Sequence, residues 1–247
     1  MGRYALSRRR LEDGEKTTLY AVRYPLGRTR VRVLYFPRPQ RLDVWCRRSG
    51  IGEAIVGGFF VRDPYRALGE LWVGGKLARH EPVADPYAGV RACVISDNGT
   101  VRFAERQYEP EFPPGDLLQA GPMLLIDGAI VFDRGTDHEG FSHGAGQFDS
   151  DITDGRHPRA AIGVGPRDVI AVACDGRRSG VDAGLTMTEL AEAMLELGAL
   201  HAINLDGGGS TTLVHRGHLL NRPYSSQDQP APQSRRIVSA LSFEPAG

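Results

Sequence analysis

The composition has no excess of charge of either sign, since lysine plus arginine and aspartate plus glutamate both total 30 in 247 residues. Without a basic excess, the sequence does not favour nucleic acid as a partner. Hydrophobic runs long enough to span a membrane are missing, and the basic start at residues 1–4 is not followed by the apolar segment of a signal peptide. We therefore expect neither a nucleic-acid partner nor a membrane partner.

Cysteine is scarce as well. The three cysteines, Cys46, Cys93 and Cys174, are odd in number and have no spacing typical of a metal site. Secreted proteins that are stabilised by disulfides usually contain more cysteines, in even numbers. We therefore expect reduced thiols and a cytoplasmic location. The hydrophobic content of 41% is that of a globular protein, and we expect one continuous domain over residues 1–247.

The most informative segment is a short apolar run that ends at Asp206 and is followed at once by Gly207, Gly208 and Gly209. Consecutive glycines are kept where the backbone needs positive φ or where a ligand approaches it closely. Lysine does not follow the glycines, which excludes a nucleotide-binding P-loop. Ser210 lacks the later glycine that shapes the nucleophile elbow of a serine hydrolase. The segment therefore predicts a ligand-facing loop beside an acid.

A strand, a helix and a second strand surround the approach to this loop. Residues 168–174 are a short apolar run with β-branched members, which is typical of a buried strand. Thr186 and Glu189 fit a capping box at the start of a helix, and Gly198 supplies its end. Residues 201–205 predict the next strand. The crossover between the two strands should be right-handed, with the strands parallel.

Parallel strands release their carboxyl ends at one edge of a sheet. Asp175 and Asp206 each follow such an end, which is where open α/β sheets bind ligands. If the two strands are neighbours, their backbones lie roughly 5 Å apart. The pattern therefore predicts one cleft that contains both carboxylates.

The N-terminal half has the pattern of a β-rich scaffold. Residues 17–24 and 29–36 flank Pro25-Leu26-Gly27 and predict a hairpin. Similar turn signals follow short apolar runs at Gly74-Gly75, Asp97-Asn98-Gly99 and Asp127-Gly128. We therefore expect a mixed α/β fold, in which a β-rich N-terminal half is continuous with a C-terminal sheet that contains the strand-helix-strand crossover.

Several fragments, in this order, resemble the phosphodiester glycosidase family. They are Ala120-Gly121-Pro122 with Leu124 and Asp127-Gly128, Arg159-Ala160-Ala161-Ile162-Gly163, Asp175-Gly176-Arg177, the stretch from Thr186 to Gly198, and the stretch from Asn204 to Ser210. The part that carries these motifs covers residues 117–245. Upstream, Gly57-Gly58-Phe59-Phe60 is similar to the family's Asn-Gly-Gly-Phe-Phe element, with Val56 in place of the asparagine. Ala160 stands where the family often has threonine.

The resemblance implies a hydrolase that cleaves the glycosidic bond of a sugar-1-phosphodiester, similar to an N-acetylglucosamine-1-phosphodiester. The partner would be a small-molecule or glycan phosphodiester substrate. Such chemistry needs a carboxylate at the anomeric carbon and donors for the departing phosphate. We expect Asp206 and Asp175 as the carboxylates. The expected substrate-binding residues are Gly57, Gly58, Phe59, Arg159, Arg177, Asn204, Gly207, Gly208, Gly209, Ser210 and Thr211.

These residues have expected roles and competing structural readings. The amides of the three glycines would form a backbone nest for the phosphate, and Arg159 or Arg177 would add a forked contact. An aspartate before glycine can serve only to form a turn, instead of acting in the site, and we prefer this structural role for Asp127. Arg159 could instead pair with a surface carboxylate. Gly57 and its neighbours could form only a bulge beside a core aromatic residue.

A non-catalytic protein that binds a glycan or phosphoglycan is the rival functional class. Such proteins usually present aromatic platforms, whereas aromatics make up only 8% of this chain and none lies beside the three glycines. This composition favours catalysis.

The polar segment over residues 133–158 predicts a lid over the cleft, because loops of this length in compact domains are commonly functional. Residues 149–155 superficially resemble a calcium loop. They fail the EF-hand pattern, because Thr153 occupies the fifth position, Gly155 comes one residue late and no glutamate closes the loop. The sequence therefore identifies no certain cofactor and leaves a divalent cation, calcium, as an open alternative.

Overall fold

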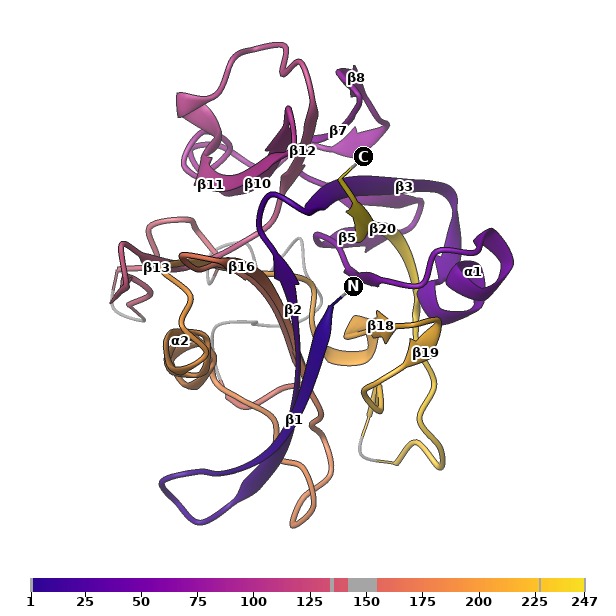
Figure 1. Ribbon diagram of the computed structural model, residues 1–247, viewed down its shortest axis with the longest axis vertical. Helices are drawn as coiled ribbons and strands as arrows, with labels where there is room; N and C mark the ends of the chain where they lie inside the picture. The colour runs from indigo at the N-terminus through magenta and orange to yellow at the C-terminus, as the bar shows by residue number, and fades with distance from the viewer. Residues whose placement is uncertain (1, 134–135, 142–154, 227, 247) are drawn as a thin grey trace.

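The computed structural model of the protein describes residues 2–133, 136–141, 155–226 and 228–246, and its strands form four sheets (Figure 1). Within these residues the helical elements are few: the α-helices α1 (Leu42–Ser49) and α2 (Met187–Glu196), and the 3-10 turns η1 (Arg106–Tyr108) and η3 (Gly208–Ser210). None of the described helices combines the length and hydrophobicity needed to cross a membrane. The fold is mostly β, with less helix than a typical α/β protein.

A seven-stranded sheet carries the motifs that the sequence singled out. Its strands lie in the order β1 (Arg3–Arg10), β2 (Lys16–Pro25), β16 (Asp168–Cys174), β15 (Arg159–Val164), β17 (His201–Asn204), β13 (Met123–Ile126) and β14 (Ala129–Ile130). β15 is antiparallel to both β16 and β17, so those two strands are parallel to each other. The predicted parallel direction is confirmed, but the condition for a spacing of roughly 5 Å is not met, because β15 pairs with both strands and lies between them.

The predicted strand-helix-strand unit is present in this sheet, with β16 leading through α2 to β17. Thr186 caps the helix, since its Oγ1 accepts the Glu189 amide at 3.1 Å and the Glu189 carboxylate accepts the Thr186 amide at 2.8 Å. The helix buries Leu190 and Met194 against the sheet. Its capping box and apolar face therefore formed as the sequence predicts.

The seven-stranded sheet is covered on both faces, which explains why β16 is apolar at every position after Asp168. Ile170 and Val172 pack with α2 on one face, whereas Val169 and Ala171 pack into the larger core on the other. Figure 1 shows α2 on one side of β16, with β18 and β20 on the other side. The strand ends that carry the site are therefore held between two packed layers.

The remaining strands form three smaller sheets. One has the order β19 (His218–Leu219), β18 (Leu213–His215), β4 (Ala54–Val56), β20 (Arg236–Pro245) and β3 (Thr29–Arg41). A second has the order β11 (Thr100–Glu105), β10 (Ala92–Asp97), β12 (Asp116–Gln119), β7 (Leu71–Val73) and β8 (Lys76–Leu77). The third contains β5 (Phe60–Arg62), β6 (Tyr65–Leu68) and β9 (His80–Glu81).

The hairpins expected at the three short turns are confirmed, because β7 pairs with β8, β10 with β11 and β13 with β14. Asp127 has positive φ in the last of these turns, which is the turn role preferred for it. The hairpin expected around Pro25 is wrong. β2 pairs with β1 and β16, whereas β3 pairs with β20, so the chain passes here from one sheet to another.

Candidate active site

Asp206 lies two residues beyond the end of β17, and backbone hydrogen bonds fix its position on both sides. Leu205 donates its amide to the carbonyl of Ala160 on β15 at 2.9 Å. The amide of Asp206 donates to the carbonyl of Gly57, just after β4, at 2.9 Å. The carboxylate is therefore presented from a rigid junction between the seven-stranded sheet and the β4 sheet.

Two buried side-chain oxygens at this junction, Oδ2 of Asp206 and Oδ1 of Asn204, have no hydrogen-bond partner within the described part of the chain. The other carboxylate oxygen of Asp206 accepts the Gly207 amide at 2.8 Å, and Asn204 Nδ2 donates to the carbonyl of Gly121 at 2.8 Å. A buried acceptor without a donor costs about 1–3 kcal/mol. Both residues line one cavity, so a ligand that brings hydroxyl donors would relieve this cost.

Burial raises the pKa of Asp206 to about 6. Four neighbours oppose this rise in pKa: the Ser210 hydroxyl, the charges of Arg235 and Arg62, and the hydrogen bond from the Gly207 amide. The Ser210 hydroxyl lies nearby, but its geometry falls short of a hydrogen bond. A carboxyl group with this pKa is mostly ionised at neutral pH and binds a proton as the solution becomes mildly acidic. It can therefore act as a base or a nucleophile near neutrality.

The three glycines after Asp206 allow other parts of the protein to approach closely. An added Cβ would meet the Pro158 carbonyl oxygen at 2.8 Å from Gly207, Nη2 of Arg177 at 3.0 Å from Gly208, and the Ser225 Oγ at 2.1 Å from Gly209. Gly208 also has φ of +59°, in the region that favours glycine. The glycines therefore bring an arginine and a loop against the carboxylate, rather than leaving bare backbone for a ligand.

The expected backbone nest for phosphate is wrong at two of its three amides. The Gly207 amide donates to Asp206, and the Gly208 amide donates to the Pro158 carbonyl at 2.7 Å. Both donors are used inside the protein, so neither is left for a phosphate oxygen.

Other predicted residues lie beside the cavity without lining it. The hydroxyls of Ser210 and Thr211 belong to residues with no exposed surface. A Cβ on Gly58 would lie 2.6 Å from the Gln119 carbonyl, and one on Gly57 would lie 2.5 Å from Ser239 Oγ, so close packing explains these two glycines. The predicted residues outside the lining are Gly57, Gly58, Asp175, Gly209, Ser210 and Thr211.

Arg177 reaches the cavity from just beyond β16, in a left-handed backbone conformation with φ of +62°. Its Nη1 donates to the carbonyls of Tyr224 at 3.3 Å and Ser225 at 2.5 Å. Burial and the charge of Arg235 lower its pKa, whereas Asp206 raises it. Among the described residues no carboxylate lies within ion-pair distance of Arg177 or Arg235. The two guanidinium groups thus form a cationic pair beside one carboxylate.

Arg159 begins β15, between the two strands that lead to Asp175 and Asp206. Its Nε donates to the Leu185 carbonyl at 3.0 Å, and Nη2 donates to the Gly155 carbonyl at 3.2 Å. The residue is 3% exposed, and the alternative of an ion pair with a carboxylate stays a prediction. Arg159 faces the cavity from the interior of the protein.

The cavity itself is narrow, with a volume of about 80 Å³. Seven of the predicted residues line it: Phe59, Arg159, Arg177, Asn204, Asp206, Gly207 and Gly208. His157 and Arg235 also line it, and neither is among the residues expected there from the sequence. Asp206 is the one carboxylate among the described residues of the lining. The site therefore combines a single carboxylate with several cationic side chains.

Asp175 is not brought together with Asp206. The side chain of Asp175 is buried, its Oδ2 accepts the Tyr20 hydroxyl at 2.8 Å, and its Oδ1 accepts the Arg222 amide at 2.6 Å. Burial raises its pKa to about 6, and the charge of Asp182 adds to the rise. Because β15 separates the two strands, their backbones lie roughly 10 Å apart at the sheet edge. Asp175 holds the end of β16 against β2.

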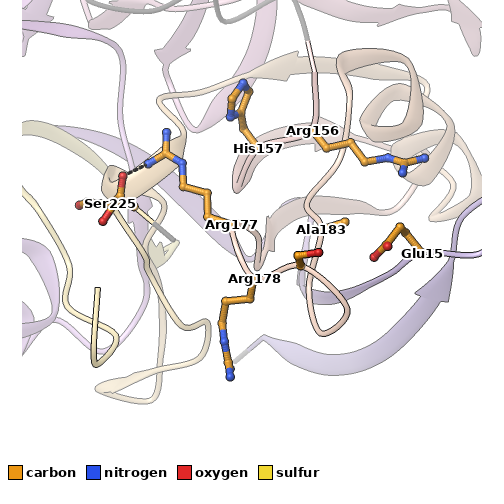
Figure 2. A pocket seen from close by; sticks show the side chains of 9 residues that line it. Glu15, Arg156, His157, Arg177, Arg178, Ala183 and Ser225 are labelled. Carbon is orange, nitrogen blue, oxygen red and sulfur yellow. Dashed lines mark hydrogen bonds between the residues drawn. The ribbon is translucent and has the colours of Figure 1, made fainter. Parts of the chain in front are cut away.

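A second, larger cavity of about 430 Å³ adjoins the first, since Arg177 and His157 line both cavities. Figure 2 shows it between Arg177 with Ser225 at one end and Glu15 with Arg156 at the other. Volumes of about 300–1,000 Å³ are typical of ligand pockets. The two cavities together have room for more than one chemical group, with Arg177 at their junction.

The predicted calcium loop at residues 149–155 lies outside the described residues apart from Gly155, and so does most of the predicted lid. Within the described part of the chain, no group of three or more His, Cys, Asp or Glu side chains is placed to hold a metal ion.

A family model described as phosphodiester glycosidase matches residues 49–243. The match covers most of the chain, and the chain therefore belongs to the phosphodiester glycosidase family. This result confirms the resemblance found in the sequence fragments.

Among characterised relatives, the chain is similar to N-acetylglucosamine-1-phosphodiester alpha-N-acetylglucosaminidase of Bos taurus. The two are 28% identical over 189 residues, which are 75% of this chain and 35% of the bovine protein. The chain thus matches about a third of the length of that relative.

Two solved structures share the fold. The zebrafish N-acetylglucosamine-1-phosphodiester alpha-N-acetylglucosaminidase catalytic domain, auto-inhibited by its pro-peptide, matches with a TM-score of 0.73 and 22% identity, over 98% of this chain and 82% of that one. A hypothetical protein from Synechocystis matches with a TM-score of 0.67 and 19% identity, over 97% of this chain and 62% of that one.

Proposed function

We propose that the protein is a hydrolase that cleaves the glycosidic bond of a sugar-1-phosphodiester and releases the free sugar and a phosphomonoester. Membership of the phosphodiester glycosidase family supports the reaction class. The name of the bovine relative supports a substrate similar to an N-acetylglucosamine-1-phosphodiester. The observation that carries the proposal is the placement of Asp206 in one small cavity with Arg177 and Arg235.

The arginines hold the phosphate. Arg177 and Arg235 have no carboxylate partner in the described structure, and a guanidinium group binds phosphate oxygens through charge-assisted hydrogen bonds. Negative charge grows on the phosphate as it leaves, so the two cations stabilise the transition state more than the ground state. A phosphate held in this way leaves readily without a strong general acid. This chemistry agrees with a cavity in which Asp206 is the one carboxylate among the described lining residues.

Asp206 acts at the anomeric carbon. Its unpartnered Oδ2 either attacks that carbon or removes a proton from the attacking water, and its negative charge stabilises the oxocarbenium-like transition state. The unpartnered Oδ1 of Asn204 accepts a hydrogen bond from a hydroxyl group of the sugar and so fixes the orientation of the sugar ring. Asn204 is held by its other amide atom, so it needs no rearrangement to do so.

The test uses the methyl ester of N-acetylglucosamine-1-phosphate, with free sugar as the measured product. We expect Asp206→Asn to lower kcat by roughly 10²–10⁴-fold, the usual effect of losing a carboxylate that acts in proton transfer. Calorimetry should still detect binding of the diester, because the arginines remain. Asp175→Asn is the matched control, since it removes a buried carboxylate that does not line the cavity. It should retain hydrolysis within a few-fold while the protein is folded.

Two results would contradict the proposal. Normal turnover by Asp206→Asn would remove the assigned carboxylate from the reaction. Binding of the diester by the unaltered protein without any release of sugar would instead favour the rival class, a phosphoglycan-binding protein.

A further inference from the structure

Asn204 is held by three hydrogen bonds to the link between β12 and β13, which consists of residues 120–122. The Gly121 amide donates to the Asn204 carbonyl at 3.0 Å, and the Asn204 amide donates to the Pro122 carbonyl at 3.0 Å. The third bond runs from Asn204 Nδ2 to the Gly121 carbonyl at 2.8 Å. Since Nδ2 and the unpartnered Oδ1 belong to one planar amide, the Gly121 carbonyl also sets the direction of Oδ1. The way in which Asn204 meets a sugar therefore depends on the position of this link.

The carboxylate of Glu139 holds both ends of the link. Its Oε1 accepts the Met123 amide at 2.6 Å, directly after the link, and its Oε2 accepts the Ala92 amide at 2.8 Å. The carbonyl of Ala92 in turn accepts the amide of Ala120, the first residue of the link, at 2.9 Å. An added Cβ on Gly121 would lie 2.5 Å from Oε2, so the glycine makes room for the carboxylate. Glu139 therefore fixes Met123 directly and Ala120 through Ala92.

Glu139 occupies this place at an energetic cost. The residue is buried, and burial raises its pKa to about 7, whereas the two amides and the charges of Arg91 and His138 lower the pKa. Burial of a carboxylate is tolerated when its oxygens are hydrogen-bonded, and here both oxygens accept an amide. A glutamine of the same shape would present one NH₂ group to a backbone N–H, so two donors would oppose each other. The position therefore requires two acceptors.

The segment of Glu139 supports the catalytic cavity at a second point. The ring of Phe141 is buried, and its centroid lies 5.6 Å from that of Phe59, which lines the cavity. Asp137 Oδ1 accepts the Phe141 amide at 2.7 Å and so fixes the backbone between them. Residues 137–141 belong to the polar segment that the sequence singles out at residues 133–158. Their described contacts are with the supports of the cavity.

We propose that Glu139 is a positioning residue for recognition of the sugar and that it acts through the link on Asn204. The proposal rests on the proposed hydrolysis of a sugar-1-phosphodiester, in which Asn204 accepts a sugar hydroxyl. Glu139 is not among the described residues that line the catalytic cavity, so it acts without contacting the sugar. Selectivity for the hydroxyl that Asn204 binds should therefore depend on Glu139 as well.

The test compares the methyl diester of N-acetylglucosamine-1-phosphate with analogues that each lack one sugar hydroxyl, at about pH 8, where most of the Glu139 carboxyl is ionised. For one analogue, we expect the unaltered protein to show a KM roughly tenfold higher, because the hydrogen bond to Asn204 is lost. Asn204→Ala should abolish this difference in KM. Glu139→Gln should reduce it at least about threefold, and the double variant should behave like Asn204→Ala alone.

Asp116→Asn is the matched control. Asp116 is also buried, and its carboxylate accepts two backbone amides, from Val33 at 3.0 Å and from Gly74 at 2.6 Å. Its replacement should lower Tm, as Glu139→Gln should, but it should leave the difference in KM between the two diesters unchanged. Glu139→Asp keeps the charge but is too short to reach both amides, so it should reduce the difference as Glu139→Gln does. It serves if Glu139→Gln does not fold.

Three results would overturn the assignment: an unaltered protein that does not discriminate between the diesters, a folded Glu139 variant that discriminates fully, or an equal loss of discrimination in Asp116→Asn. Failure to hydrolyse any of the diesters would contradict the proposed function instead. Calorimetric binding of the same diesters to the Asp206→Asn protein, with and without Glu139→Gln, would then still decide the role of Glu139.

Discussion

Replacing Gly208 by alanine tests how the three glycines after Asp206, which we call the triple-glycine corner (Gly207, Gly208 and Gly209), position Arg177. An added Cβ at Gly208 would lie 3.0 Å from Nη2 of Arg177 and 3.3 Å from its Cζ. Comfortable contacts between heavy atoms are about 3.5–4.0 Å, so the guanidinium group must move by roughly half an ångström. The hydrogen bond from its Nη1 to the Ser225 carbonyl, at 2.5 Å, restrains this movement. The change therefore pushes the phosphate-binding group away from the place where the protein holds it.

The expected size of the effect has two parts. The φ of +59° at Gly208 costs an alanine about 1–2 kcal/mol of unfolding free energy. For a protein of this size, that loss lowers Tm by roughly 2–8 °C. Partial loss of a charge-assisted hydrogen bond between Arg177 and the phosphate, about 1.4 kcal/mol, raises KM for the methyl diester roughly tenfold.

Gly217→Ala separates the loss of stability from the rise in KM. Gly217 has φ of +78°, and nothing lies within 4 Å of an added Cβ, so its replacement brings the backbone strain alone. Calorimetry should give similar losses of Tm for both variants, while steady-state kinetics should raise KM only in Gly208→Ala. Equal KM values in the two variants would refute the claim that the corner exists to seat Arg177.

The remaining predictions concern pH. Because burial raises the pKa of Asp206 to about 6 and the ionised form reacts, kcat/KM for the methyl diester should rise with pH through a midpoint near 6; a flat profile over about pH 5 to 8 would contradict this role. The pKa of Asp175 is also raised to about 6, so the native state keeps a proton that the unfolded chain has already released. Its carboxyl group should therefore cost up to about 3 kcal/mol of stability as pH rises from about 4 to 7, and Asp175→Asn should lack this loss in denaturation experiments at each pH.

Local signals in the sequence predicted the elements that carry the site. The apolar run of β16, the capping box of α2 and the run before Asp206 each depend on neighbouring residues, and the structure contains all three. The turns at Asp127 and at residues 97–99 were predictable for the same reason, because positive φ there selects particular residues. Seven predicted site residues consequently line one cavity.

Pairings between distant segments could not be predicted in the same way. The rule for parallel crossovers predicts that β16 and β17 run in the same direction, but it does not predict whether another strand lies between them. In the structure β15 lies between them. Arg235 shows the same limit, because the hydrogen bond that holds its backbone beside the cavity runs to the carbonyl of Gly209, which is far away in the sequence. Asp175 was misplaced because its partners, Tyr20 and Arg222, also come from remote segments.

Hydrolysis of the methyl diester in water enriched in ¹⁸O tests most directly which bond is broken. If Asp206 directs water or itself to the anomeric carbon, the phosphate keeps its original oxygens, and mass spectrometry of the released methyl phosphate should find no ¹⁸O. Incorporation of ¹⁸O into the methyl phosphate, or release of methanol and sugar-1-phosphate, would show that the protein cleaves a phosphorus–oxygen bond instead.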